Sequence, residues 1–428
     1  MKTPEEFLKE NGFTLAADID RAAMIATFVS EMEKGLAGQP SSLAMIPTYV
    51  GVDGKIPQGT KAAVLDAGGT NYRSGVVTIP PAVEDKKNQP MPGTKGEVDV
   101  ETFYASFAEE AKRVLPKATV KKLGFCFSYP AEATPGLDAK LMVWTKGIQA
   151  PGVVGQYVGK ELLARLGGGE IAVVNDTVAT LLAAKATEGD KTYSSYLGFI
   201  LGTGTNTAYV ERNANILKLS GLDPEGSMIV NAESGAFDKL SRSKFDAAMD
   251  AKQPDTGNHP FEKMISGAYL GPVGLEVYKA AAKEGFFSKS AAERIAGLAS
   301  LETMDFDNFT AGCRKEGRDN PLDEIFADPS DAKMARRLGL PVFERAAVFT
   351  AVHLAAFVIK TGEGASPAAP VAINADGSTY YKTRAIPFDE TVRRELDDML
   401  VKRRNVHYEI TPQVDDAPMV GAGIAAML

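Results

Sequence analysis

The segment Leu65-Asp66-Ala67-Gly68-Gly69-Thr70-Asn71-Tyr72-Arg73 decides the fold class of this 428-residue chain. Apolar and β-branched residues flank the paired glycines over 61–66 and 71–79, which predicts two strands joined by a tight turn. The pattern recurs at Leu201-Gly202-Thr203-Gly204-Thr205-Asn206. Because β and α patterns alternate between the two copies, the sequence predicts a duplicated α/β architecture with a cleft between two lobes.

The rest of the chain supplies the elements around these two units. Apolar periodicity predicts helices over 1–45, 103–114, 153–166 and 177–188, and mostly helix over 239–361. Strands are expected at 123–127, 171–174, 371–374 and 406–410, and an exposed loop at 80–98, which is rich in Pro, Lys and Gly. His353 lies inside an apolar stretch and is expected to be a core residue.

Composition excludes several classes of function. The chain has 47 basic and 55 acidic residues, a net charge of −8, and so lacks the basic field of a general nucleic-acid binder. Cys126 and Cys313 are too far apart in the sequence to indicate a disulfide framework, and the three histidines lack metal-ligand spacing. The longest apolar stretch, 346–359, is too short to cross a bilayer. We therefore expect a cytoplasmic protein with no nucleic-acid or membrane partner.

The first glycine turn has the residues that a phosphate site needs. Paired glycines let backbone N–H groups approach an oxyanion closely, and the threonine, asparagine and arginine that follow add further donors. Asp66 ends the preceding strand, where it could hold Mg²⁺ directly or through water. The alternative is an ordinary hairpin turn. The second turn, Gly202-Thr203-Gly204-Thr205, is weak evidence alone, but two cradles across a cleft suit a nucleotide triphosphate.

Two further segments offer groups for catalysis. Asn175-Asp176-Thr177 lies where a buried strand passes into a helix, and a carboxylate at a helix N-terminus is stabilised in its charged form. Asp176 could therefore accept a hydroxyl proton, unless it is only an N-cap. Lys146, beside a glycine in Trp144-Thr145-Lys146-Gly147, could pair with a transferring phosphoryl group. An exposed turn lysine is the alternative.

One further glycine pattern is discounted. Gly421-Ala422-Gly423-Ile424-Ala425-Ala426 has the spacing of a dinucleotide-binding turn, but only two residues follow it, which leaves no room for a βαβ unit. The chain also contains no GxxxxGK[ST] loop, so we expect neither a Rossmann nor a P-loop nucleotide site.

Taken in order, the motifs resemble those of the hexokinase family over most of the chain. The matching segments are 45–50, 65–73, 124–130, 144–148, 174–177, 201–206, 231–237, 261–271 and 376–380. The resemblance implies an actin-like ATPase (ribonuclease H-like) fold with two lobes around a cleft. It implies a small lobe at 62–176, with 415–428 packed on it, and a large lobe at 1–61 and 177–414.

The resemblance also implies a reaction, in which MgATP phosphorylates the 6-hydroxyl of a hexose. Glucose is the default acceptor, with mannose or fructose as alternatives. By position, Asp176 would be the general base and Lys146 would contact the reacting oxygen and the γ-phosphate. The residues implied to bind the sugar are Ser128, Thr145, Lys146, Asn175, Asp176, Asn206 and Glu233. Both glycine turns and Gly377-Ser378 would bind ATP, and Asp66 would hold Mg²⁺ through water.

Four positions depart from the family pattern. Pro272 stands where the family has a sugar-binding glutamate, and it has neither an acceptor side chain nor an N–H. Leu275 replaces an arginine, Ser234 a tryptophan and Pro418 a small polar residue. The first two changes bear on glucose selectivity and leave the transfer machinery intact.

Two other classes of function compete with the kinase. One is a sugar-binding regulator that kept the fold and lost catalysis. The other is an actin-like filament former or chaperone ATPase, which would use the two cradles but not the sugar-binding residues. The oligomeric state, any allosteric regulation and the preferred phosphoryl donor are left open by the sequence.

Overall fold

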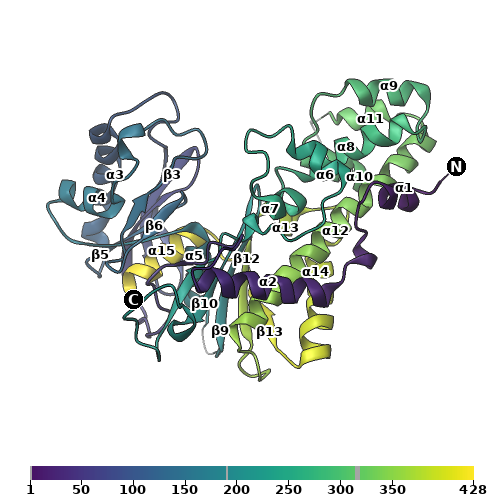
Figure 1. The fold of residues 1–428 in the computed structure, drawn as a ribbon. Coiled ribbons are helices and arrows are strands. Elements are labelled where there is room, and N and C mark those ends of the chain that lie inside the picture. Colours follow the sequence, from purple (N-terminus) through teal and green to yellow (C-terminus); the bar gives the residue numbers. More distant parts are fainter. Residues whose placement is uncertain (1, 189–190, 314–318) are drawn as a thin grey trace.

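The computed structural model describes residues 2–188, 191–313 and 319–428, which form two lobes (Figure 1). The first lobe contains a five-stranded sheet with the strand order β4-β3-β2-β5-β8. Its strands are β2 (Lys61–Ala67), β3 (Asn71–Thr78), β4 (Ala82–Pro90), β5 (Lys122–Phe127) and β8 (Glu170–Val174). β2, β3 and β4 pair antiparallel, whereas β2, β5 and β8 pair parallel. Helices α3 (Val100–Val114) and α4 (Val158–Leu166) pack on one face.

The second lobe repeats this topology. Its six-stranded sheet has the order β1-β11-β10-β9-β12-β13. The strands are β1 (Ile46–Pro47), β9 (Ser195–Leu201), β10 (Thr205–Arg212), β11 (Ser227–Asn231), β12 (Val371–Asp376) and β13 (Tyr408–Ile410). β9, β10 and β11 pair antiparallel, and β12 and β13 continue the sheet in parallel with β9. The predicted duplicated α/β architecture is therefore confirmed.

Helices α5 (Asp176–Ala186) and α15 (Ala417–Met427) lie between the two sheets and pack against each other (Figure 1). Small residues make this close approach possible. A Cβ on Gly421 would stand 1.8 Å from the carbonyl oxygen of Ala179, and one on Gly124 would stand 2.1 Å from that of Ala422. The glycines of α15 therefore allow close helix packing. They lie inside a helix and not in a nucleotide-binding turn, as expected from the sequence.

Helices fill the outer part of the second lobe. They are α1 (Pro4–Glu10), α2 (Arg21–Leu36), α6 (Lys244–Asp250), α7 (Pro260–Ile265), α8 (Leu270–Lys283), α9 (Lys289–Gly297), α10 (Thr303–Ala311), α11 (Pro321–Ile325), α12 (Pro329–Thr361), α13 (Ser378–Lys382) and α14 (Phe388–Leu396). They follow the helical pattern predicted for 239–361 and extend beyond it.

The long helix α12 forms the centre of this lobe. Among the described residues it is the one helix long and apolar enough to span a membrane, but 89% of its apolar window is buried inside the protein. The sequence predicts an apolar segment, 346–359, that is too short to cross a bilayer. This prediction was wrong about length, because the helix spans Pro329–Thr361. His353 on α12 is buried among the rings of Phe28, Phe199 and Phe261, and burial lowers its pKa to about 3. It is a core residue, as predicted.

Three predicted segments differ from the structure. The segment 80–98 contains β4, an edge strand whose mostly exposed polar side chains have the composition of a loop. The first 45 residues form two α-helices rather than one, and Gly12, with φ +75°, follows the end of α1. The helix expected at 153–166 begins only at Val158, because Gly155 has a positive φ of +83°.

A buried carboxylate on α3 ties three elements of the first lobe together. Glu110 is 3% exposed, and its oxygens accept hydrogen bonds from Ser74 (2.7 Å), Arg113 (2.6 Å) and Gln89 (3.1 Å). Burial raises the pKa of Glu110, but these hydrogen bonds outweigh burial and lower the pKa to about 2. A carboxyl group whose folded-state pKa is depressed stabilises the fold above its ordinary pKa and loses this effect as the pH falls.

We therefore expect Glu110→Gln to lower the free energy of unfolding at pH 7 by about 2 kcal/mol, the value of a charge-assisted hydrogen bond. The difference from the parent protein should shrink as the pH falls from about 4.5 towards about 2, where the parent carboxylate is itself protonated. Urea unfolding at pH 7 and pH 3 measures this. The exposed neighbour Glu109 provides the control Glu109→Gln, and a pH-independent difference between Glu110→Gln and the parent would contradict the account.

Candidate active site

A cavity of about 740 Å³ lies between the two lobes. The turns that follow β2 and β9 both line it, and so does the start of α5. The predicted residues that it brings together are Gly68, Gly69, Thr70, Ser128, Thr145, Lys146, Asn175, Asp176, Thr203, Gly204, Thr205, Asn206 and Glu233. The predicted residues outside its lining are Asp66, Asn71, Arg73, Gly202, Gly377 and Ser378.

The first glycine turn presents bare backbone to this cavity. A Cβ built on Gly68 or Gly69 would have no atom within 4 Å, so the space above both residues is open. Their carbonyl oxygens are held, because Lys146 donates to the oxygen of Gly68 (2.7 Å) and the Tyr129 hydroxyl donates to that of Gly69 (3.2 Å). A fixed turn with an open face is the geometry in which backbone groups can approach an oxyanion.

Arg73, which the sequence assigns to the first phosphate motif, contacts two carboxylates and does not line the cavity. Its guanidinium forms an ion pair with Asp66 and donates to Asp416 at 2.8 Å. Asp416 precedes α15, so Arg73 connects the first glycine turn to the C-terminal helix. The structure therefore does not bring Arg73 into the cavity, and Asn71 is also outside it.

Asp66 is the residue that the sequence assigns to magnesium. Burial raises its pKa, the charge of Arg73 opposes this rise, and the charge of Asp176 adds to it. Asp66 lies near the end of β2, just before the first glycine turn, and Asp176 lines the cavity together with that turn. Proteins commonly hold Mg²⁺ with one or two carboxylates plus the phosphates of the substrate, so this placement fits the ion. In the parts of the chain that the structure describes, no group of three or more His, Cys, Asp or Glu side chains is arranged to hold a metal by itself.

The start of α5 positions Asp176. Asn175 is the N-cap, and its side-chain oxygen accepts the N–H of Thr177 at 2.9 Å. Asp176 is the first residue of the helix, so its carboxylate is not used as the cap and faces the cavity. The Thr177 hydroxyl donates to one of its oxygens at 3.3 Å. The alternative that Asp176 is only an N-cap is therefore wrong, because Asn175 caps the helix.

The loop with Lys146 is anchored by the single tryptophan. The Trp144 indole donates to the carbonyl oxygen of Ala150 at 2.7 Å, and its ring packs edge-on against Tyr129. Lys146 has a left-handed backbone with φ +58°, which is strained for a residue with a side chain. Its ammonium donates to the carbonyl oxygens of Gly68 and Ser128. An ammonium has three donors, so one remains for a ligand.

A network of amides and one carboxylate forms the opposite wall. Oε1 of Glu233 accepts hydrogen bonds from Asn231 (2.8 Å) and Asn206 (3.2 Å). Burial raises the pKa of Glu233, the hydrogen bond from Asn231 opposes this, and the charge of Asp176 raises it further. Glu233 also has a left-handed φ of +54°. Sequence reasoning did not assign Asn231, although this residue stands two positions before Glu233.

A second carboxylate in this wall was not found from the sequence. Glu262 on α7 lines the cavity, and its Oε2 accepts the N–H of Thr205 at 2.8 Å. Pro272 and Leu275, the departures on α8, are not part of the lining. Glu276, the nearest later acid, forms an ion pair with Lys252 and is also outside the lining.

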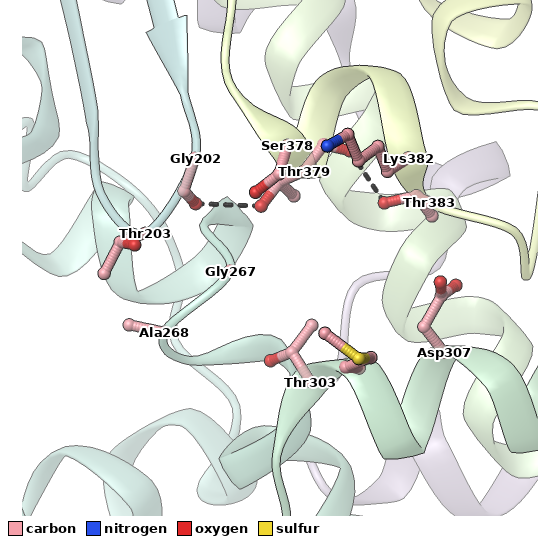
Figure 2. A pocket seen from close by; sticks show the side chains of 11 residues that line it. Gly202, Thr203, Gly267, Ala268, Thr303, Asp307, Ser378, Thr379, Lys382 and Thr383 are labelled. Carbon is pink, nitrogen blue, oxygen red and sulfur yellow. Dashed lines mark hydrogen bonds between the residues drawn. The ribbon is translucent and has the colours of Figure 1, made fainter. Parts of the chain in front are cut away.

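A smaller pocket of about 260 Å³ adjoins the second glycine turn (Figure 2). Gly202 and Ser378 lie here, with Thr379 donating to the carbonyl oxygen of Gly202 at 2.8 Å. Gly377 has φ +110°, and a Cβ there would stand 2.3 Å from the carbonyl oxygen of Leu201. Only glycine therefore allows β12 and α13 to approach the turn this closely.

The far wall of this pocket comes from α10, which sequence reasoning did not connect to the site. Figure 2 shows Thr303 and Asp307 across from Ser378 and Thr379. Both oxygens of Asp307 accept backbone N–H groups of residues 384 and 385, and burial raises the pKa of its carboxyl group. No local sequence signal marks these residues, because they meet the turn only through the packing of α10 beside α13.

Comparison with known proteins gives a consistent result. Two models described as hexokinase match residues 10–186 and 196–428. Hexokinase-1 of Saccharomyces cerevisiae is 30% identical over 91% of this chain and 84% of that protein. Hexokinase-2 of Candida albicans is 30% identical over 97% of this chain and 90% of that protein. The structure of a hexokinase from Schistosoma mansoni complexed with glucose has a TM-score of 0.73 at 25% identity, covering 99% of this chain and 98% of the other.

Proposed function

Because this chain belongs to the hexokinase family of ATP-dependent sugar kinases, we propose that it transfers the γ-phosphoryl group of MgATP to the 6-hydroxyl of a hexose. Glucose is the default acceptor, and mannose and fructose are the alternatives. One observation carries the proposal: Asp176 lines the same cavity as both glycine turns. Phosphoryl transfer to a hydroxyl depends on positioning, charge stabilisation and a base for the hydroxyl proton, and a carboxylate beside two glycine turns suits these needs.

The acceptor would lie between Asp176 and the amide wall. The side chains there are Ser128, Thr145, Asn175, Asn206 and Glu233, and they offer donors and acceptors for the hydroxyl groups of a sugar. As the 6-oxygen attacks the γ-phosphorus, its proton would pass to the carboxylate of Asp176. The new bond forms at the sugar oxygen, and ADP leaves with the electrons of the broken bond.

The donor would be held by the two turns. The first turn and Lys146 would contact the transferring group, and the second turn, with Gly377 and Ser378, would hold the rest of the nucleotide. Asp66 and Asp176 would help the phosphates to hold magnesium, which would neutralise negative charge there when bound. Closure of the lobes over the sugar would exclude water as a competing acceptor.

A sugar-panel assay tests this function. The protein with MgATP is assayed for ADP release in the presence of glucose, mannose, fructose and other hexoses, with no-sugar reactions as controls. We expect ADP release that depends on at least one of the first three sugars. Background release with every hexose would contradict the transferase and favour a sugar-binding regulator, and ATP-driven polymerisation without sugar would favour a filament former.

A further inference from the structure

The smaller pocket beside the second glycine turn adjoins the large cavity. Thr203 and Ala268 line both, whereas Asp176 lines only the large cavity. The N–H of Ala268 donates to the carbonyl oxygen of Thr203 at 3.0 Å, so these two shared residues are held together. A donor whose γ-phosphoryl group lies beside Asp176 can therefore extend past Thr203 into the smaller pocket, where the part that is not transferred would lie.

Two charged side chains line the smaller pocket among the residues that the structure describes, Asp307 and Lys382. Asp307 is already used by the protein, because its two oxygens accept the backbone N–H groups of Arg384 and Ala385 at 2.8 to 3.0 Å. Lys382 differs, since within the described ranges its ammonium has neither a hydrogen bond nor an ion pair. In this described lining, the charge that is open to a ligand is therefore positive.

Lys382 lies beside a residue that the sequence assigns to the nucleotide. Lys382 and Ser378 are four residues apart on α13, so their side chains leave the same face of the helix. Figure 2 shows Ser378, Thr379 and Lys382 on one side of the pocket, with Thr303 and Asp307 across from them. A hydroxyl and an ammonium thus stand together beside the second glycine turn. Both can donate hydrogen bonds to phosphate oxygens, and the ammonium forms the stronger, charge-assisted kind.

We propose that Lys382 binds the phosphates of the nucleotide donor that are not transferred, at the α- or the β-position, and so helps to set the affinity for this donor. The proposal rests on the proposed hexokinase function. Lys146 lines the large cavity with Asp176, so two lysines would divide the donor between them. Lys146 would contact the group that is transferred, and Lys382 the part that leaves as ADP. Because the second contact is the same before and after transfer, it strengthens binding without lowering the barrier to the chemical step.

The test is equilibrium binding of adenosine, AMP and MgADP to the parent protein and to Lys382→Gln, measured by titration calorimetry. We expect the Kd for MgADP to rise about fivefold or more in the variant, the loss of one charge-assisted hydrogen bond after solvent screening at an exposed side chain. The Kd for adenosine should not change, because adenosine has no phosphate. A weaker affinity for AMP as well would place the contact at the α-phosphate, and a loss for MgADP alone would place it at the β-phosphate.

Two further variants separate the charge from its position. Lys402→Gln removes an exposed cation outside both pockets, and it should leave the Kd for MgADP unchanged. Lys382→Arg keeps the charge and should retain most of the affinity. Raising the ionic strength should weaken MgADP binding to the parent protein more than to Lys382→Gln. In steady-state assays, the loss in Lys382→Gln should appear in the KM for MgATP rather than in kcat.

An unchanged Kd for MgADP in Lys382→Gln would overturn the proposal, and so would an equal loss for adenosine, which indicates a structural effect. If Lys382→Gln does not fold, Lys382→Met is measured against the same outcomes. A parent protein that does not bind MgADP would overturn both this proposal and the proposed function. A parent protein that binds MgADP through Lys382 but releases no ADP with any hexose would contradict the proposed function alone.

Discussion

Replacing Asp176 with asparagine is expected to lower kcat by about 10²- to 10⁴-fold, the usual contribution of a general base. The asparagine side chain would have nearly the same shape at the first turn of α5 but could not accept the proton of the sugar hydroxyl. Asn175 would still cap the helix through Thr177, so the local structure should persist. The loss should therefore appear in kcat, with sugar binding changed little.

Intrinsic fluorescence measures whether Asp176→Asn still binds the sugar. Trp144 is the single tryptophan, and it packs against Tyr129 in the loop that holds Lys146, so its emission should report sugar binding. The control is Glu101→Gln, which removes an exposed acid from the first turn of α3. A kcat for Asp176→Asn within about threefold of the parent value would exclude Asp176 as the base.

The second large effect is expected far from the cavity, at a buried ion pair. The Arg345 guanidinium on α12 binds both oxygens of Asp246, at 2.8 and 2.7 Å, and lies 4.0 Å from the ring centre of Phe13. Both side chains are almost completely buried. Burial raises the pKa of Asp246, but the charge of Arg345 and the hydrogen bonds from Arg345 and Ser243 together outweigh burial, and the pKa is lowered overall.

Arg345→Met should lower the free energy of unfolding by about 3–5 kcal/mol, because it leaves a buried carboxylate without its counter-charge. The double variant Arg345→Met/Asp246→Asn should lose less than the single variant, since the uncompensated charge is gone. Urea unfolding at pH 7 measures both. A single variant that loses less than about 1 kcal/mol, or a double variant less stable than the single one, would contradict this account of the pair.

The parts of the molecule that could be predicted from the sequence have local signals. Paired glycines between β-branched stretches predict the turns after β2 and β9, and the strand–helix junction predicts the position of Asp176. The duplicated architecture is predicted because the same strand–glycine turn–strand pattern occurs twice in the sequence. Each of these signals lies within about ten residues, where backbone sterics and hydrophobic periodicity decide the structure.

The parts that could not be predicted depend on contacts between distant segments. Arg73 follows a glycine turn, yet it pairs with Asp416, and no local pattern shows this. Glu262 and Asp307 reach the site only because α7 and α10 pack beside the second turn. β4 is polar because it is an edge strand, so its composition resembles that of a loop.

The most direct test of the central claim is the identity of the product. The protein is incubated with MgATP and uniformly ¹³C-labelled glucose, and the phosphorus–carbon couplings of the product are read by NMR. The account predicts an ester phosphorus coupled to carbon 6 of the sugar, formed by the parent protein and almost absent with Asp176→Asn. Phosphate released only as inorganic phosphate, or an ester formed equally well by the variant, would contradict it.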